Sequence, residues 1–191
     1  GGGQPEKSPY YEKIVKVDPG VNIGFELGYL GKQVFSAVLR AMRVEDASPT
    51  MQTALNTWDN LQRSRRLTLE NLKAEIQNTA QERVKEALLT RLNQLEGSGI
   101  ITKSGEGVTI EELLEGEELM EGGLLVINLK DKTVITQFII VQLFITKLAN
   151  ILSDPSSPSL VLILEEAQMY MAHSDIQEVV TRLRHLGLHQ M

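Results

Sequence analysis

Hydrophobic and polar residues follow different periods along the chain, and each change of period marks an expected change of structure. The apolar run Ile14 to Val17 is typical of a short strand. Residues 18–20 (Asp-Pro-Gly) follow it and indicate a turn. Residues 21–25 alternate between apolar and polar, as in a second short strand, whereas residues 31–44 repeat their apolar positions at helical spacing. The first part of the chain therefore predicts two strands and a helix.

From residue 48 the helical period continues without strand signals. Ser48 and Pro49 form a typical helix start. Proline has no backbone N–H, and in the first turn of a helix that N–H would have no partner within the helix. A second helix is expected to begin near Leu67, and a third near Ala80. Residues 48–98 thus predict an all-helical insert subdomain.

After residue 98 the pattern changes again, to short apolar runs separated by helices. The expected elements are a hairpin over 99–109, an acidic helix over 110–115, a strand buried on both faces over 124–129, a long apolar helix over 134–152, a second buried strand over 160–164 and a helix over 175–186. Strand, covering helix and strand form the βαβ unit of a parallel sheet, so the fold class is α/β. We expect residues 14–47 and 99–191 to form this core, and residues 1–13 to be a tag or flexible lead.

Composition narrows the function classes. The chain has 191 residues, a formal net charge of −6 and no cysteine. The charge argues against a protein that coats nucleic acid over its whole surface, and the absence of cysteine excludes disulfides and thiolate metal sites. The apolar stretch 134–152 contains Gln137, Gln142 and Lys147, so it predicts a buried helix and no membrane span. We take the cytoplasm as the expected location.

The segment with the strongest chemical signal is Leu160 to Gln168, where an apolar run leads directly into Glu165 and Glu166. Ligands of open α/β sheets bind at the carboxyl ends of the strands. Two adjacent carboxylates at such an end repel each other and favour a bound cation or a role in proton transfer. The alternative is a strand that simply enters a solvated loop.

Several segments together resemble the HerA-type and conjugation-type motor ATPases of the FtsK/HerA superfamily, which are P-loop proteins that move DNA as hexameric rings. The similar segments are Pro19 to Ile23, Leu88 to Leu92, Leu125 to Leu129, the Leu-Glu-Glu-Ala-Gln run at 164–168, and Arg184 to Leu188. The resemblance implies a partial P-loop-type parallel sheet, ATP and Mg²⁺ as cofactors, DNA as a partner, self-association as a hexamer and a nuclease as a further partner.

The resemblance also implies roles for individual residues. Glu165 matches the acid on the magnesium side, Glu166 the catalytic glutamate and Gln168 the polar sensor. Arg184 matches an arginine that reaches the nucleotide of a neighbouring subunit, a task that suits a permanently charged, bidentate group. The sequence departs from the family pattern at these positions, with Glu165 in place of aspartate, Gln168 in place of histidine and His185 in place of lysine.

No Gly-x-x-x-x-Gly-Lys-Ser/Thr phosphate loop occurs in the sequence. Residues 24–32 contain glycines and a lysine, but at the wrong spacing, and we interpret Gly28 and Gly31 as turn residues. We therefore expect an internal fragment of a DNA-translocating ATPase that carries the Walker B strand and is inactive alone. The alternative is a non-catalytic interaction or assembly module with a degenerate ATPase-like core.

Two smaller groups leave alternatives open. Arg63, Arg65 and Arg66 form a basic cluster that would suit phosphate contacts in a DNA motor, or would simply be a solvated turn. His185 and His189 have the spacing of a metal-binding pair on a helix, but Gly187 between them favours surface histidines.

Overall fold

A computed structural model of the protein describes residues 14–116, 123–154, 161–163 and 189–190. The fold is mixed α/β, with small parallel sheets and flanking helices. The strand pairs are β1 (Ile14–Val17) with β4 (Leu124–Ile127), β2 (Phe25–Glu26) with β3 (Ile101–Thr102), and β5 (Val161–Leu162) with β6 (His189–Gln190). Every pair is parallel, as the predicted α/β class requires.

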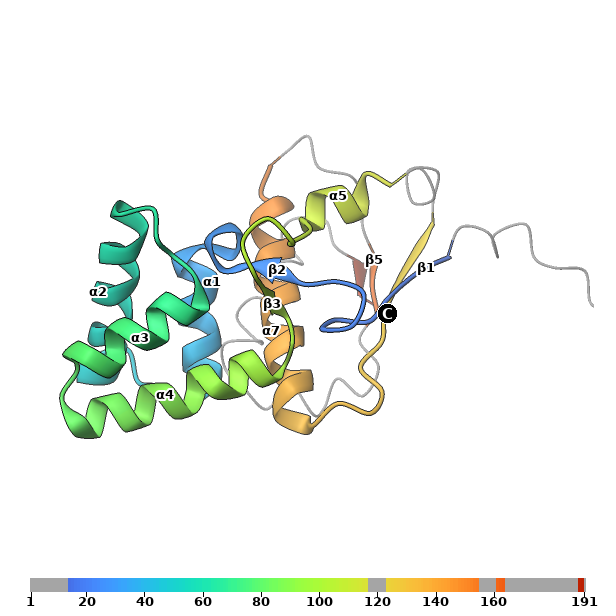
Figure 1. Ribbon diagram of the computed structural model, residues 1–191. Coiled ribbons are helices and arrows are strands. Elements are labelled where there is room, and N and C mark those ends of the chain that lie inside the picture. Colours follow the sequence, from blue (N-terminus) through green and yellow to red (C-terminus); the bar gives the residue numbers. More distant parts are fainter. Residues whose placement is uncertain (1–13, 117–122, 155–160, 164–188, 191) are drawn as a thin grey trace, which may run out of the picture.

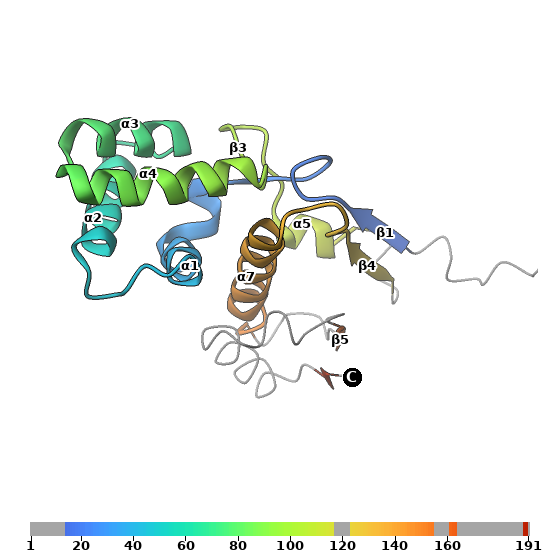
Figure 2. The same ribbon diagram turned by 90° about the horizontal axis from the view of Figure 1, so that it is seen from below.

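The helices lie on one side of the β1/β4 pair and extend away from it (Figure 1). They are α1 (Leu27–Ala41), α2 (Pro49–Arg63), α3 (Leu69–Thr79), α4 (Glu82–Gly97), α5 (Ile110–Leu114) and α7 (Val134–Ile151). Figure 2 shows α7 standing between α1–α4 on one side and β1 and β4 on the other. The long helix therefore joins the helical part of the molecule to the sheet part.

The helices α2, α3 and α4 confirm the helices predicted for this stretch, and their starts have local causes. The Ser48 hydroxyl accepts a hydrogen bond from the Met51 N–H at 3.2 Å, and Pro49 occupies the first helical position. The Thr68 hydroxyl caps α3 in the same way, 3.1 Å from the Asn71 N–H. Each of these helices is determined by residues close together in the sequence, which is why the sequence indicates the helices.

A continuous apolar core joins α1 to these three helices. Its fully buried members include Trp58 of α2, Leu72 of α3 and Leu92 of α4. The Trp58 ring stacks on Phe35 of α1 with 4.7 Å between the ring centroids, and its Nε1 donates to the Gln62 side chain at 3.0 Å. Because α1 shares this core, the helical part of the structure includes a helix outside the predicted insert.

Helix α7 is buried on nearly all sides over its central turns. Within it, the buried Gln142 side chain donates to the Thr146 hydroxyl at 3.0 Å, one turn along the same helix. With 18 residues and a mean hydropathy of 1.7, α7 has the length and composition of a membrane-crossing helix, and 61% of it is buried within the protein. Core helices of soluble proteins have the same properties, so this finding does not distinguish the two.

A seam of glycines brings distant backbone segments into direct contact next to β2. A Cβ on Gly99 would lie 2.8 Å from the Cα of Gly20, and both residues have positive φ. The Phe25 N–H donates to the Ile100 carbonyl at 2.7 Å, and the Val108 N–H donates to the Gly24 carbonyl at 2.9 Å. Only residues without a side chain allow this close approach, so the glycines fix where the helical part meets the sheet part.

Three predictions about the first half of the α/β part are wrong in detail. No hairpin forms over 99–109, because β3 pairs with β2 and not with its own sequence neighbour. Residues 20–22 form a turn, and the strand is confined to Phe25–Glu26. Helix α1 begins at Leu27 rather than Gly31, since Gly31 interrupts it with a φ of 80° and ψ of 162° without ending it.

The strand prediction for 124–129 is confirmed as β4, but its burial is not. Leu124 is 49% exposed and the other residues of β4 are half-buried. For the predicted strand 160–164, the structure shows β5 at Val161–Leu162, and Ile163 is 56% exposed. The expected burial on both faces is therefore wrong for β4, whose only paired neighbour among the described strands is β1, and for Ile163. Residues 1–13 and the predicted helix 175–186 lie outside the described residues.

Candidate functional site

The residues to which the sequence assigns catalysis lie outside the part of the chain that the structure describes. They are Glu165, Glu166, Gln168 and Arg184. Their roles stay predictions. The described residues contain other groups of polar side chains. Two such groups stand out, one at the carboxyl ends of β1 and β4 and one where α1, α5 and α7 meet.

Asp18 and Asn128 lie side by side because their strands are parallel and in register. Val17, the last residue of β1, faces Ile127, the last residue of β4, so each polar residue directly follows its strand. The Asn128 N–H continues the ladder to the Val17 carbonyl at 2.8 Å. Its side-chain Nδ2 donates to Asp18 Oδ2 at 3.1 Å. The two strand ends are thus joined through their side chains as well as their backbones.

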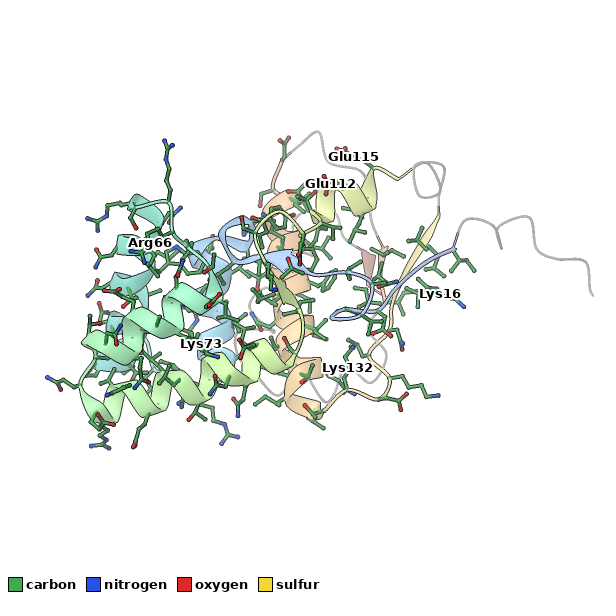
Figure 3. All side chains as sticks on the ribbon, in the orientation of Figure 1. Lys16, Arg66, Lys73, Glu112, Glu115 and Lys132 are labelled. Carbon is green, nitrogen blue, oxygen red and sulfur yellow. The ribbon has the colours of Figure 1, made fainter. Side chains whose placement is uncertain are left out.

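Lys132 completes this group from the turn that leads into α7. Its Nζ lies 2.9 Å from Asp18 Oδ1, and the lysine side chain is mostly buried. The hydrogen bond from Lys132 holds the pKa of the Asp18 carboxyl below its ordinary value, with smaller help from Asn128 and against the opposing effect of burial. We call Asp18, Asn128 and Lys132 the strand-end cluster (Figure 3 labels Lys132).

The loops around the strand-end cluster are held by their own hydrogen bonds. The Asp18 N–H donates to Asn22 Oδ1 at 2.6 Å, which closes the turn after β1. On the other side, the Asn128 Oδ1 accepts from the Lys130 N–H at 3.1 Å, and the Gln137 side chain donates to the Lys132 carbonyl at 3.1 Å. These contacts fix both loops, so the carboxylate and the ammonium group are held in place before any ligand arrives.

The chemistry available to the strand-end cluster follows from its charges. One carboxylate and one ammonium group neutralise each other, and the amide of Asn128 adds a donor and an acceptor. No group of three or more His, Cys, Asp or Glu residues that could hold a metal ion occurs within the described residues. The cluster can therefore orient a polar ligand, but a Mg²⁺ site here would need further carboxylates, for which Glu165 and Glu166 are the sequence candidates.

The glycine-rich segment 24–32 does not have the conformation of a phosphate loop. Gly28 lies within the first turn of α1 and Gly31 forms the kink of that helix, so the predicted turn residues are helical or at a helix kink. Lys32 Nζ donates to the Asp59 carboxylate of α2 at 2.6 Å. The lysine that would contact phosphate is instead paired with an acid.

The second polar group centres on Tyr29, which lies just before the kink of α1. Its hydroxyl donates to the Glu111 carboxylate of α5 and accepts from the Ile110 N–H at 2.8 Å. Lys147 of α7 places its Nζ 4.0 Å from the centroid of the tyrosine ring. Burial, followed by the hydrogen bond to Glu111, raises the pKa of the tyrosine hydroxyl. These contacts hold α5 against α1 and α7, and we interpret their role as structural.

Sequence reasoning missed both groups for the same reason. Asp18, Asn128 and Lys132 are single polar residues whose partners lie far away in the sequence, and Tyr29 has no motif around it. A partial signal did exist for the strand-end cluster, because Asp18 directly follows one predicted strand and Asn128 is the polar residue near the end of another. That signal becomes specific only once the two strands are known to be parallel neighbours.

Comparison with known proteins adds no further constraint on the site. Searches against protein-family models, curated proteins and solved structures found no match to this chain.

Proposed function

We propose that this chain is part of an ATP-hydrolysing motor of the HerA/FtsK type that moves DNA. The observation that supports the proposal most is the strand-end cluster. Parallel strands β1 and β4 end side by side, and each is followed at once by a polar residue. In open α/β sheets this is the edge at which ligands bind.

The order of elements also supports the proposal. Strand β4 leads into α7, and α7 is followed along the chain by β5, after which the sequence reaches Glu165 and Glu166. In the motor, Glu165 would support Mg²⁺ and Glu166 would orient the attacking water, with Gln168 beside them and Arg184 contacting a neighbouring subunit's nucleotide. The assembly would be a homo-oligomer, with six subunits as the family resemblance implies, acting on DNA in the cytoplasm alongside a nuclease.

ATP binding in this motor needs a phosphate cradle beyond the described residues. Lys32 is paired with Asp59, and the glycines before it lie in α1. Backbone N–H groups and a free lysine normally supply the phosphate contacts. We therefore propose that the ATPase activity belongs to the intact protein that contains this chain.

The test is the substitution Glu166→Gln in the intact protein, with ATP turnover as the readout. A general base or water-orienting group contributes about 10²- to 10⁴-fold, so we expect turnover to fall by at least about 100-fold. The matched control is Glu115→Gln, which removes an exposed carboxylate of the loop after α5 and should leave turnover unchanged. Turnover near the wild-type rate in Glu166→Gln would show that the assigned role is wrong.

A non-catalytic interaction or assembly module is the second candidate. The observation that favours it is the pairing of Lys32 with Asp59, together with the neutral Asp18–Lys132 pair, which leaves no free cation at either position. Such a module would self-associate or bind a protein equally well with and without ATP. The mass of the assembly, measured by light scattering with and without Mg²⁺–ATP, distinguishes it from an ATP-dependent ring.

A further inference from the structure

Three arginines at the junction of α2 and α3 carry charges that the described residues do not neutralise. Arg63, Arg65 and Arg66 are all exposed, and within the described residues none of their side chains forms an ion pair or hydrogen bond. We call residues 63–66 the arginine loop. Three positive groups in four residues repel one another, and no acidic side chain among the described residues neutralises them.

The lysines of the neighbouring helices α3 and α4 are paired with acids, unlike the arginines of the loop. Lys73 lies 2.7 Å from Glu96, and Lys85 lies 2.7 Å from Glu82. Asp59, one helical turn before Arg63, would be that arginine's natural partner, but it binds Lys32 instead. The charge of the arginine loop therefore remains available to a ligand.

Glu70, in the first turn of α3, is the acid that follows the loop most closely in the sequence. Among the described residues it forms no ion pair with any of the three arginines. An acid in a first turn interacts favourably with the helix dipole, which explains Glu70 without the arginines. Glu70 therefore does not neutralise the charge of the arginine loop.

The backbone of the arginine loop favours glycine where the chain has arginine. The Arg66 N–H donates to the Leu61 carbonyl at 2.9 Å and the Arg65 N–H to the Gln62 carbonyl at 3.1 Å, the hydrogen-bond pattern of a Schellman helix end. Arg65 accordingly has a φ of +57°. A side chain in this left-handed conformation costs energy that glycine avoids. No hydrogen bond or ion pair of the Arg65 side chain offsets this cost among the described residues.

The arginine loop also lies away from the acidic residues of the α5 region. Figure 3 shows Arg66 on the helical side, whereas Glu112 and Glu115 of the α5 region lie on the other side of α7. The chain as a whole has a net charge of −6, so three neighbouring positive groups are a local feature of this surface. Such a separation attracts a polyanion to one part of the surface and repels it from another.

We propose that the arginine loop binds the phosphate backbone of DNA. This inference rests on the proposed function and names the surface at which the motor would contact its substrate. Guanidinium groups stay charged at every physiological pH and bind phosphate oxygens in a bidentate manner. Residues 63–66 contain no aromatic side chain that could stack on a base. We therefore expect the loop to bind phosphates without specificity for the base sequence.

The chain contains its own control for this proposal. Arg43 occupies the same position at the end of α1, with a φ of +62°, its N–H donating to the Arg40 carbonyl and the Val44 N–H donating to the Leu39 carbonyl. It is likewise exposed, and its side chain forms no hydrogen bond or ion pair among the described residues. Arg43 therefore matches Arg65 in backbone strain and in single charge, but it is not part of the arginine loop.

The experiment measures binding of the full chain to a short labelled DNA duplex of mixed sequence, between about 50 and about 200 mM salt. The variants are Arg65→Gly, Arg43→Gly and the triple change Arg63→Gln, Arg65→Gly and Arg66→Gln. Each phosphate contact contributes about one unit to the slope of log affinity against log salt. We expect Arg65→Gly to lower that slope by about one and the triple variant by about three, with Arg43→Gly unchanged.

Loss of folding does not confuse this result, because both glycine variants relieve backbone strain and should melt no lower than the wild type. Failure of the wild-type chain to bind DNA at the lowest salt would overturn the proposal, as would equal slopes in the wild type and the triple variant. Binding to phosphatidylserine vesicles that depends on the loop, without DNA binding, would overturn it in favour of a membrane surface. The binding assay contains no ATP, so its result does not depend on ATP turnover. Loop-dependent DNA binding by a protein whose intact form shows no ATP turnover would uphold this inference while refuting the motor.

Discussion

The helical part of the molecule and the strand ends of β1 and β4 are held together by different forces. In the helical part, Trp58, Leu72 and Leu92 are fully buried and the stabilisation comes from apolar packing. At the strand ends, Asp18, Asn128 and Lys132 are joined by hydrogen bonds and an ion pair. Apolar packing is strong and insensitive to pH, whereas the polar contacts are weaker and depend on charge. The comparison predicts that damage to the two regions will differ both in size and in pH dependence.

The largest expected effect is in the helical core. Trp58→Ala should destabilise the protein by about 3–5 kcal/mol, because it removes a fully buried ring that stacks on Phe35 and leaves a cavity. Chemical denaturation followed by circular dichroism measures the loss, since Trp58 is the single tryptophan and its fluorescence disappears with it. The control is Val134→Ala at a position that is 66% exposed, where the change should stay within about 0.5 kcal/mol. Equal effects of the two changes would contradict the core assignment.

The next largest effect is expected at the glycine seam between the two regions. Gly99→Ala should cost about 3 kcal/mol, because its Cβ would lie 2.8 Å from the Gly20 Cα and its φ is +69°. Gly105→Ala is the matched control, since Gly105 also has a positive φ but an added Cβ meets no atom within 4 Å. The free energies of unfolding of the two variants separate the backbone contact from the strain. A Gly99→Ala variant as stable as Gly105→Ala would mean that the seam can open without cost.

A smaller and more local effect is expected at α5. The Thr109 hydroxyl accepts from the Glu112 N–H at 3.1 Å, and the Glu112 carboxylate accepts from the Thr109 N–H at 2.8 Å, so the two residues form a capping box. Thr109→Ala should cost about 1 kcal/mol, whereas Thr109→Ser keeps the hydroxyl and most of the stability. Amide hydrogen exchange of α5 measures this, with faster exchange expected in the alanine variant only.

The effect at the strand ends is the one that depends on pH. The pKa of Asp18 is lowered in the folded protein, so its contribution to stability is present above its unfolded pKa of about 3.9 and is lost as the pH falls through the folded value. Asp18→Asn should therefore lower the melting temperature at neutral pH, and its curve should converge on the wild-type curve in acid. Melting temperatures from neutral pH to below pH 3.9 provide the measurement. Glu115→Gln serves as the control, because Glu115 forms no ion pair among the described residues. Parallel curves for Asp18→Asn and the wild type would show that the ion pair adds no stability.

The same contrast explains how much the sequence could predict. Helices α2, α3 and α4 were predictable because their signals are local: the Ser48–Pro49 start of α2 and an apolar stripe along each helix. Strands β1 and β4 and helix α7 were also indicated by their apolar runs. The hairpin prediction failed because the partner of β3 is β2, more than 70 residues earlier in the chain. A two-residue strand has no periodicity from which such a partner could be inferred.

The candidate site was less predictable than the fold. The contact between Asp18 and Asn128 joins residues 110 positions apart, and no property of either residue indicates the other. The acid pair Glu165–Glu166 was found from its position after an apolar run, but that pattern locates a site only if the strand lies inside a sheet. Structure was therefore needed to bring together the polar groups at the strand ends, and the roles of the two glutamates remain predictions.

The kink at Gly31 gives helix α1 two separate attachments. Before it, Tyr29 holds to α5 and to Lys147 of α7; beyond it, Lys32 and Phe35 hold to α2. A straight helix would have one continuous packing face and could pack well against only one of these neighbours. With the axis broken at a glycine, a single element acts as a bracket between the two halves of the molecule, and a change in the angle at that residue would turn one half relative to the other.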